Sequence, residues 1–312
     1  MPRYAEVPEP VLQNEDQVIM AVKAAAIKHL DKGRASGKHY SAAGAGWQPT
    51  VIGGDGVGIL SDGTRVFALG ASGMIAEKAL VEKSRMVKLP DGLEDAAAAA
   101  LPNAVAGSAM ALRFRAAMQP GETVLINGAT GFTGKIAVQI AKHYGAKKII
   151  VTGRNAQTLQ SLLALGADEI ISVNQDDEQL VAELKKIHDH TPIDVIIDYL
   201  WGHTAEVILS SLKGKGSFTH RVRFVSVGAV TGDKIQLSAE NLRSVDLQLS
   251  GSGLGSWAKE EMKLLFSEIL PEMFALAADN KLKVDTEAVR LADIAKLWDR
   301  EVPDGKRLVV MI

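Results

Sequence analysis

A chain of 312 residues is too long for one ordinary domain and suits two. Apolar residues make up 47% and charged residues 23%, so the chain can bury a sizeable core. The net charge is −2 with no long block of one sign, which argues against a nucleic-acid binder with a basic face. The absence of cysteine excludes disulfides, thiol nucleophiles and thiolate zinc sites.

Neither a secretory signal nor a membrane span is expected. Residues 1–13 lack a basic patch followed by an apolar run. Apolar stretches elsewhere fall short of the roughly 20 residues that a span needs. We therefore expect a cytoplasmic protein whose partners are small molecules, not membranes or nucleic acids.

The segment 18–87 predicts β-structure, because short runs rich in β-branched residues are separated by glycines. The expected strands are 18–22, 57–60, 65–69 and 75–81. Two helices are expected next, an alanine-rich helix over 94–101 and a second helix over 104–114, after Pro102.

From residue 122 onward, strands and helices alternate regularly. The expected strands are 123–127, 148–152, 169–173, 194–199, 223–227 and 247–250. The expected helices are 133–144, 157–165, 178–187 and 204–212. Repeated β-α units of this length, with strands rich in isoleucine and valine, predict an α/β fold with a parallel, doubly wound sheet.

The tail predicts a return to the first segment. It carries a long amphipathic helix over 259–278, a short helix over 291–300 and a final strand over 307–312. We therefore expect three parts: a β-rich catalytic domain beginning at 1–102, a dinucleotide-binding domain inserted at 103–252, and a return to the catalytic domain at 253–312.

A glycine-rich turn lies between the first strand of the alternating segment and its helix. This placement is typical of a dinucleotide fingerprint, in which glycines let the backbone approach a pyrophosphate and the helix N-terminus offers N–H groups to it. The spacing departs from Gly-x-Gly-x-x-Gly, because threonine holds the middle position. A tight turn without a ligand is the alternative. The residues expected at the cofactor are Gly128, Ala129, Thr130, Gly131, Phe132, Thr133 and Gly134.

The end of the second strand indicates which dinucleotide binds. Versions that bind NAD place an acidic residue about 20 residues beyond the motif, to hold the ribose 2′-hydroxyl. Here that position holds Arg154, between Gly153 and Asn155. A guanidinium can pair with a 2′-phosphate, so we expect NADPH. The alternative is a surface arginine near the start of a helix.

Five segments resemble the medium-chain dehydrogenase/reductase family. They are VKAAA with the following residues to Asp31 at 22–31, IGGDGVG at 52–58, PGETVL at 120–125, VQIAK at 138–142 and LGAD at 165–168. The second segment is similar to quinone oxidoreductases, and the resemblance covers nearly the whole chain. It implies a Rossmann domain inserted in a GroES-like β-rich domain, with the active site between them, and a homodimer paired along strand 247–250.

The resemblance also bears on zinc. Zinc enzymes of this family carry a cysteine where this chain has Lys28 and a histidine where it has Gly54, and they often carry a cysteine-rich structural loop. None of these ligands is present, so we expect no metal.

The candidates for catalysis near the implied active site are Lys28, Tyr40 and Asp31, with weaker claims for His29 and Ser108. Quinone oxidoreductases commonly have an asparagine where Lys28 stands. The ammonium of Lys28 could stabilise the charge that develops as hydride arrives, and desolvation would then lower its pKa. Alternatively, Lys28 points to solvent, Tyr40 only packs, and Asp31 fixes its loop by hydrogen bonds.

Strand ends in the alternating segment supply the remaining cofactor contacts. Ligands of such folds bind at the carboxyl ends of the strands, where the strand order reverses. The residues expected beside the nicotinamide and its ribose are Tyr199, Val227, Gly228 and Ser252. The alternative for the neighbouring Leu200 and Trp201 is that they cover the sheet.

Together these features predict an NADPH-dependent oxidoreductase that transfers hydride to a quinone or an α,β-unsaturated carbonyl without zinc. A zinc-free alcohol dehydrogenase or ketoreductase is one alternative, and a non-catalytic NADPH-binding protein is another. The sequence leaves the physiological substrate and any proton donor open.

Overall fold

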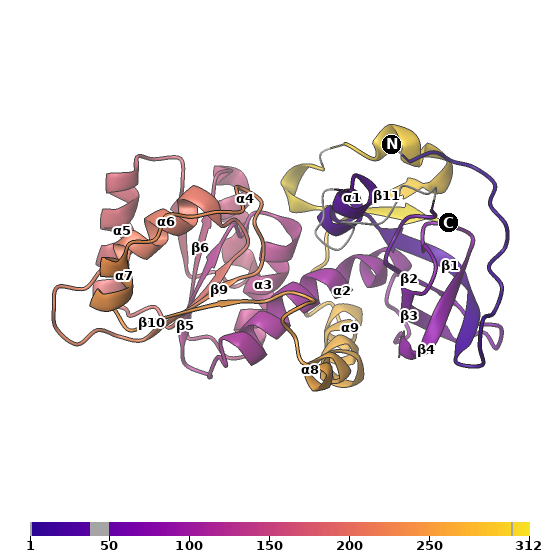
Figure 1. Cartoon of the computed structure of the whole chain (residues 1–312), viewed down its shortest axis with the longest axis horizontal. Helices are drawn as coiled ribbons and strands as arrows, with labels where there is room; N and C mark the ends of the chain where they lie inside the picture. The colour runs from indigo at the N-terminus through magenta and orange to yellow at the C-terminus, as the bar shows by residue number, and fades with distance from the viewer. Residues whose placement is uncertain (1, 38–49, 301) are drawn as a thin grey trace. The chain divides into compact units, whose positions relative to one another are not determined.

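The computed structural model describes residues 2–37, 50–300 and 302–312 (Figure 1). The chain divides into two compact units, which we call the split unit (Met1–Asn103 with Lys263–Ile312) and the inserted unit (Ala104–Met262). The sequence placed these boundaries at 102/103 and 252/253. Within the described ranges, no helix combines the length and apolar character that a membrane span needs.

The inserted unit is built on a six-stranded sheet in the order β10-β9-β8-β5-β6-β7. All of its strand pairs are parallel. Its strands are β5 (Thr123–Asn127), β6 (Lys148–Gly153), β7 (Glu169–Ser172), β8 (Val195–Asp198), β9 (Val222–Ser226) and β10 (Leu247–Gly251). The strand order reverses between β5 and β8, so the predicted doubly wound sheet is confirmed, and its carboxyl edge at that point is the place where ligands bind in such folds.

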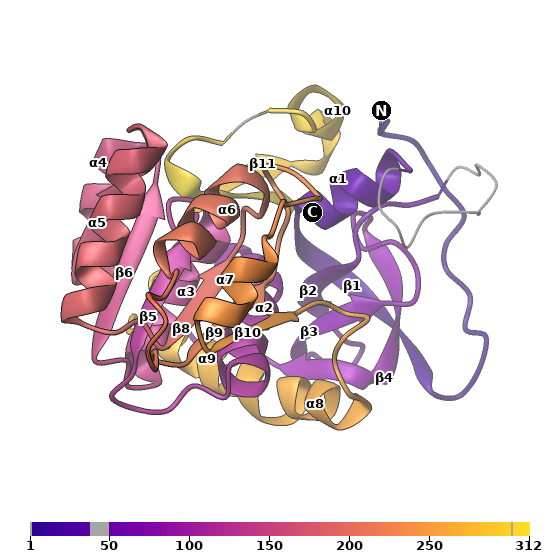
Figure 2. The same cartoon turned by 60° about the vertical axis from the view of Figure 1, so that its left-hand side comes forward.

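Helices connect consecutive strands of this sheet (Figure 2). They are α3 (Phe132–His143), α4 (Ala156–Ser161), α5 (Asp177–His190), α6 (Gly202–Ser211) and α7 (Ala239–Ser244). In α5, Leu180, Leu184 and Ile187 repeat at helical spacing and are buried in one cluster with residues of the sheet and of α6. The cluster fixes the strands whose ends carry the candidate site.

Helix α2 differs from its prediction. It runs without interruption over Asp95–Met110, with Pro102 inside it, and continues as a π-helical turn over Ala111–Arg115. A proline removes one backbone hydrogen bond and normally breaks a helix. Here the residues around Pro102, including Ala98, Leu101 and Val105, are almost fully buried. Tertiary packing therefore holds the helix together against the local cost of the proline.

The split unit contains a mainly antiparallel sheet in the order β11-β12-β1-β2-β3-β4. Its strands are β1 (Gln17–Ala26), β2 (Asp55–Ile59), β3 (Arg65–Gly70), β4 (Lys78–Lys88), β11 (Thr286–Arg290) and β12 (Arg307–Met311). Strand β1 also pairs with β4, so β1 to β4 form a closed ring. Strand β12 pairs antiparallel with β1, as expected for a tail that returns to the first segment.

Several local elements of the split unit differ from the predictions. The sequence missed strand β11 and helix α1 (His29–Ala35). The long helix expected over 259–278 consists of α8 (Lys259–Leu264), a π-helical turn and α9 (Leu270–Ala278). The helix expected over 291–300 is shorter, with α10 covering Ile294–Leu297. Phe274 of α9 packs edge-on against Phe67 of β3, which anchors the tail helix on the ring.

Candidate cofactor and active site

The glycine-rich turn lies at the carboxyl edge of β5, directly before α3. Gly128 has a φ of +85°, and a Cβ there would lie 2.8 Å from Leu200 Cγ. A Cβ at Gly134 would lie 2.5 Å from the Ala129 Cα, so only glycine lets the helix pack against the turn. By contrast, a Cβ at Gly131 would meet nothing within 4 Å. Two glycines therefore close the turn, and the third leaves open space at the start of α3, where an anion binds favourably.

The threonine in the middle of the fingerprint is accommodated by a glycine on the next strand. A Cβ at Gly153, the last residue of β6, would lie 2.4 Å from Thr130 Cγ2. The side chain of Thr130 thus lies over the end of β6, in space that any other residue at position 153 would fill. Gly153 was expected as a cofactor contact, but this packing role could not be found by spacing alone.

A buried polar network ties together the three strands at the point where the strand order reverses. Asn127 Nδ2 donates to Asp198 Oδ1 at 2.7 Å, and Thr152 Oγ1 donates to Asn127 Oδ1 at 2.6 Å. The turn joins this network, because the Gly128 N–H donates to Thr152 Oγ1 at 3.2 Å. The sequence missed this network. Its signal was the polar residue near the end of each apolar strand.

Asp198 also organises the loop after β8. Its carboxylate accepts the N–H groups of Leu200 at 3.1 Å and of Trp201 at 3.0 Å. Burial raises the pKa of Asp198, whereas the hydrogen bonds from Leu200, Asn127 and Trp201 act to lower it. Trp201 adopts a φ of +56° and a ψ of −154°, a region that non-glycine residues rarely enter. Its indole packs edge-on against Phe224, so Trp201 covers the sheet as the structural alternative proposed.

Tyr199 lies just beyond β8 and directs its hydroxyl to the second half of α2, which belongs to the inserted unit. The hydroxyl lies 2.9 Å from Ser108 Oγ and 3.4 Å from the Gly107 carbonyl. Ser108 Oγ lies 2.7 Å from the Ala104 carbonyl oxygen, to which it donates its proton, so Tyr199 donates to Ser108. Burial raises the pKa of Tyr199 well above its usual value, which keeps the hydroxyl protonated. The expected contact of Tyr199 with the nicotinamide stays a prediction.

The other residues expected at the cofactor on this edge already use some of their polar groups in hydrogen bonds within the protein. The N–H groups of Val227 and Gly228 donate to the Asp198 carbonyl oxygen at 2.8 Å and 3.2 Å. Ser252 is buried, and its hydroxyl accepts a hydrogen bond from the Trp257 indole at 3.0 Å. These residues shape the wall at the ends of β9 and β10, and their contacts with a cofactor stay predictions.

Arg154 follows β6 and is exposed. Its carbonyl accepts a hydrogen bond from Asn174 Nδ2 at 2.8 Å, while Asn155 caps α4 by accepting the Thr158 N–H at 2.8 Å. The Arg154 guanidinium forms no ion pair with any residue that the structure describes. The backbone around the arginine is therefore fixed, and its charge stays available.

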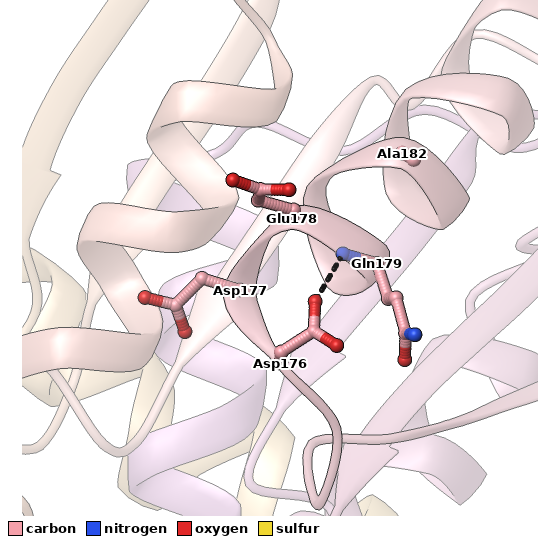
Figure 3. A pocket seen from close by; sticks show the side chains of 5 residues that line it. All are labelled: Asp176, Asp177, Glu178, Gln179 and Ala182. Carbon is pink, nitrogen blue, oxygen red and sulfur yellow. Dashed lines mark hydrogen bonds between the residues drawn. The ribbon is translucent and has the colours of Figure 1, made fainter.

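A surface hollow of the inserted unit lies elsewhere, at the start of α5 (Figure 3). Asp176, Asp177 and Glu178 line it, and Asp176 Oδ1 caps the helix by accepting the Gln179 N–H at 3.0 Å. Three carboxylates at this position repel a phosphate group. The hollow is therefore not an extension of an anion site at the glycine-rich turn.

In the split unit, the structure places Lys28 in a buried ion-pair cluster. Its ammonium contacts Asp55 Oδ1 and lies 3.4 Å from Asp31 Oδ2. Burial alone would lower the pKa of Lys28, but the carboxylates of Asp55 and Asp31 outweigh it and raise the pKa. The alternative that Lys28 points to solvent is therefore wrong, and so is the expected lowering of its pKa. The sequence missed Asp55, whose side chain meets Lys28 only in the folded chain.

Asp31 fixes its loop by hydrogen bonds, which was the alternative to a catalytic role. Asp31 Oδ2 accepts the Lys28 N–H at 3.0 Å and Oδ1 accepts the Gly54 N–H at 3.1 Å, so the carboxylate joins α1 to the segment before β2. Tyr40 lies outside the residues that the structure describes. His29 is exposed at the start of α1. The structure thus joins Lys28 and Asp31 in one cluster within the split unit.

Comparisons with known proteins agree with this fold. A family model described as zinc-binding dehydrogenase matches residues 133–270. A probable NADPH-dependent quinone reductase of Emericella nidulans is 26% identical over 99% of this chain and 96% of its own length. Human quinone oxidoreductase is 31% identical over 67% of this chain and 61% of its own length. The solved quinone oxidoreductase of Thermus thermophilus has a TM-score of 0.77 and 25% identity, covering 99% of this chain and 95% of that chain.

The sequence relatives and the solved structure indicate the same architecture. The relatives match both units, and the solved structure covers nearly the whole chain. The inserted unit carries the doubly wound parallel sheet, and the split unit carries the ring of β1 to β4. On these grounds the chain is a quinone oxidoreductase-like protein of the medium-chain dehydrogenase/reductase type.

Proposed function

We propose that the protein is an NADPH-dependent oxidoreductase that transfers hydride to a quinone or an α,β-unsaturated carbonyl without zinc. The observation that carries the proposal is the open phosphate-binding turn at Gly131 together with the guanidinium of Arg154 one strand away, which no described residue pairs. Relatives named as NADPH-dependent quinone reductase and quinone oxidoreductase support the same activity.

The residues of the inserted unit fit a dinucleotide. The open space beside Gly131 would accept the pyrophosphate at the start of α3. The end of β6 carries Gly153, Arg154 and Asn155, with no carboxylate that would hold a free ribose 2′-hydroxyl. Arg154 would instead pair with a 2′-phosphate. The ends of β8, β9 and β10 would form the wall for the nicotinamide half.

Hydride transfer is the chemistry that the bound cofactor supplies. The protein's own contribution is to hold the cofactor in one orientation and to exclude water. The network of Asn127, Thr152 and Asp198 supports this role, because it fixes the strand ends around the turn. We place the rate enhancement in this positioning and in backbone donors.

The proposed mechanism does not rely on the side chains first considered for catalysis. The ammonium of Lys28 and the carboxylate of Asp31 are buried partners of one another, and neither is offered to a ligand within the described residues. A role for Tyr40 at the substrate stays a prediction. Among the described residues no side chain stands out as a proton donor for an alkoxide, so none of them favours the ketoreductase alternative.

Zinc does not fit the residues at hand. Thiolates are absent from the whole sequence. Among the described residues, no group of three histidine, aspartate or glutamate side chains is arranged to hold a metal ion. At the position where zinc enzymes of this family carry a cysteine ligand, this chain has Lys28, whose ammonium is itself a cation. No step of the proposed reaction is routed through a metal.

Arg154→Ala tests the cofactor assignment. Removing the guanidinium loses a charge-assisted pair of about 2 kcal/mol, which is roughly a thirtyfold weaker Kd for NADPH. NADH carries no 2′-phosphate, so its Kd should barely change. Arg221→Ala is the matched control, because Arg221 is an exposed arginine next to the opposite end of the sheet, before β9. Equal losses for NADPH and NADH, measured by fluorescence titration, would refute the assignment.

A substrate screen tests the reaction itself. NADPH oxidation should be faster with quinones or enones than with simple ketones and aldehydes. Turnover with ketones alone would support the ketoreductase instead. Tight NADPH binding without turnover of any acceptor would support a non-catalytic NADPH-binding protein.

We also propose a homodimer in the cytoplasm. In the fully described inserted unit, β10 pairs with β9 on one side only, and an uncovered strand edge favours pairing with a second copy. Light scattering checks this, since a single chain has a mass of 33.2 kDa. The cytoplasmic location rests on the sequence and stays a prediction.

A further inference from the structure

Four charged side chains are buried together in the split unit. The exposed fractions are 2% for Lys28, 4% for Asp31, 8% for Asp55 and 9% for Arg307. They come from the turn between β1 and α1, from α1 itself, from the start of β2 and from the start of β12. Fully buried ions are rare unless they are paired, so this cluster requires an explanation.

The contacts show that Lys28 lies at the centre of the carboxylates. Its Nζ contacts Asp55 Oδ1 and lies 3.4 Å from Asp31 Oδ2. Arg307 donates to the Ile27 carbonyl oxygen at 3.4 Å and interacts electrostatically with both carboxylates. Two positive and two negative charges therefore lie together inside the unit, and the ammonium of Lys28 is close to both acids.

Two buried carboxylates need a cation beside them. Without one, each would keep the cost of leaving water, and the two would repel each other. In many proteins a metal ion balances such a pair. Here the tethered ammonium is in that place. Burial and the charge of Arg307 act to lower the pKa of Lys28, but Asp55 and Asp31 raise it further, which keeps the ammonium charged.

We propose that the Lys28 ammonium is the resident cation of a two-carboxylate site formed by Asp31 and Asp55, standing where a metal ion would otherwise balance them. Lys28 is then a positioning residue, which acts through these carboxylates and not on the substrate. Asp31 passes this positioning on, because it holds the N–H groups of Lys28 and Gly54 and so fixes α1 against the segment before β2. The proposal rests on the zinc-free part of the proposed function.

The proposal explains why the site excludes metals as well as why it needs none. A divalent ion would meet the repulsion of the ammonium at the point where both carboxylates converge. Among the described residues, no third acidic or histidine side chain is grouped with Asp31 and Asp55. Removing the ammonium should therefore turn the acid pair into a weak site for a divalent ion, and adding a thiolate should strengthen it.

The first test compares the stability of charge variants by thermal unfolding. Lys28→Met leaves Arg307 as the remaining cation of the cluster beside two buried acids and should lower Tm by roughly 6 °C or more. Lys28→Met combined with Asp55→Asn removes one charge of each sign and should recover most of that loss. Lys23→Met is the matched control, because Lys23 lies on β1, five residues before Lys28, and forms no described ion pair. A loss no larger than that of the control, or no recovery in the double variant, would overturn the proposal.

The second test asks whether variants without the ammonium bind a metal ion in its place. Removing a lysine with only a structural role would not create such a binding site. Co²⁺ or Zn²⁺ should raise the Tm of Lys28→Ala and should leave wild type and Lys23→Met unchanged. Lys28→Cys should bind Co²⁺ with a thiolate charge-transfer band that is absent from wild type. If Lys28→Ala does not fold, the Co²⁺ spectrum of Lys28→Cys decides, and its absence counts against the proposal. A metal-dependent rise in the Tm of wild type would also overturn it.

These outcomes are separable from those of the proposed function. The Kd for NADPH should stay within a few-fold of wild type in Lys28→Met, because the phosphate turn belongs to the inserted unit. If wild type fails to bind or oxidise NADPH, the proposed function fails while the metal titrations keep their meaning.

Discussion

Removing the carboxylate of Asp198 should destabilise the inserted unit far more than removing an exposed acid. Asp198 is fully buried and accepts hydrogen bonds from Asn127 Nδ2 and from the N–H groups of Leu200 and Trp201. In Asp198→Ala these three donors lose their acceptor. At the low end of about 1 kcal/mol for each unsatisfied donor, the loss is about 3 kcal/mol. For a domain of this size that lowers Tm by roughly 6–12 °C.

The assay is thermal unfolding followed by circular dichroism, with Asp246→Ala as the control. Asp246 is exposed and its only described ion pair, with Arg221, spans 3.9 Å, so its removal should change stability by less than about 0.5 kcal/mol. Asp198→Asn should cost less than Asp198→Ala, because one oxygen can still accept the loop N–H groups. A loss in Asp198→Ala no larger than that of Asp246→Ala would refute the assignment of the network as the support of the strand ends.

Two further predictions follow from close contacts in the inserted unit. Gly153→Val should weaken NADPH binding at least several-fold with little effect from the control Gly255→Val, since a Cβ at 153 would lie 2.4 Å from Thr130 Cγ2 whereas one at 255 meets nothing within 4 Å; equal Kd values for the two variants would contradict this. Burial and then the neighbouring His220 lower the pKa of His188 below 6.5, and its Nδ1 accepts the Ile193 N–H at 3.1 Å. Between pH 6.5 and the lowered pKa the unfolded chain therefore binds a proton that the folded chain does not, so stability should fall as pH drops across this interval and level off below it. Urea unfolding at several pH values checks this, with a flatter slope expected for His188→Gln and an unchanged slope for His190→Gln.

The local repeat was enough to predict the inserted unit. Strand and helix periods alternate from residue 122 onward, and each period can be seen within a short window of sequence. The glycine turn at 128–134 was found for the same reason, because its strand and its helix lie directly on either side. Arg154 followed from a simple count along the second strand. These features depend on neighbours in the chain, so no tertiary information was needed.

Local signals failed where packing opposed them. Pro102 indicated a helix end, yet the buried residues on either side keep α2 continuous. Thr130 stands where the fingerprint usually has a glycine, yet Gly153 on the neighbouring strand leaves space for its side chain. In both cases a residue from another part of the fold decided what the local preference could not.

The sequence alone determined the alternating order of strands and helices, the glycine-rich turn and the position of Arg154 after the second strand, because each depends on contiguous residues. It also singled out Lys28 as unusual, but it could not say what the ammonium does. Only the tertiary structure decided that, because the partners of Lys28 include Asp55, 27 residues away, and the cluster is completed by Arg307 from the last strand. The pKa and the role of a buried charge depend on the groups that surround it in the folded chain. Spacing along the sequence does not indicate which groups those are.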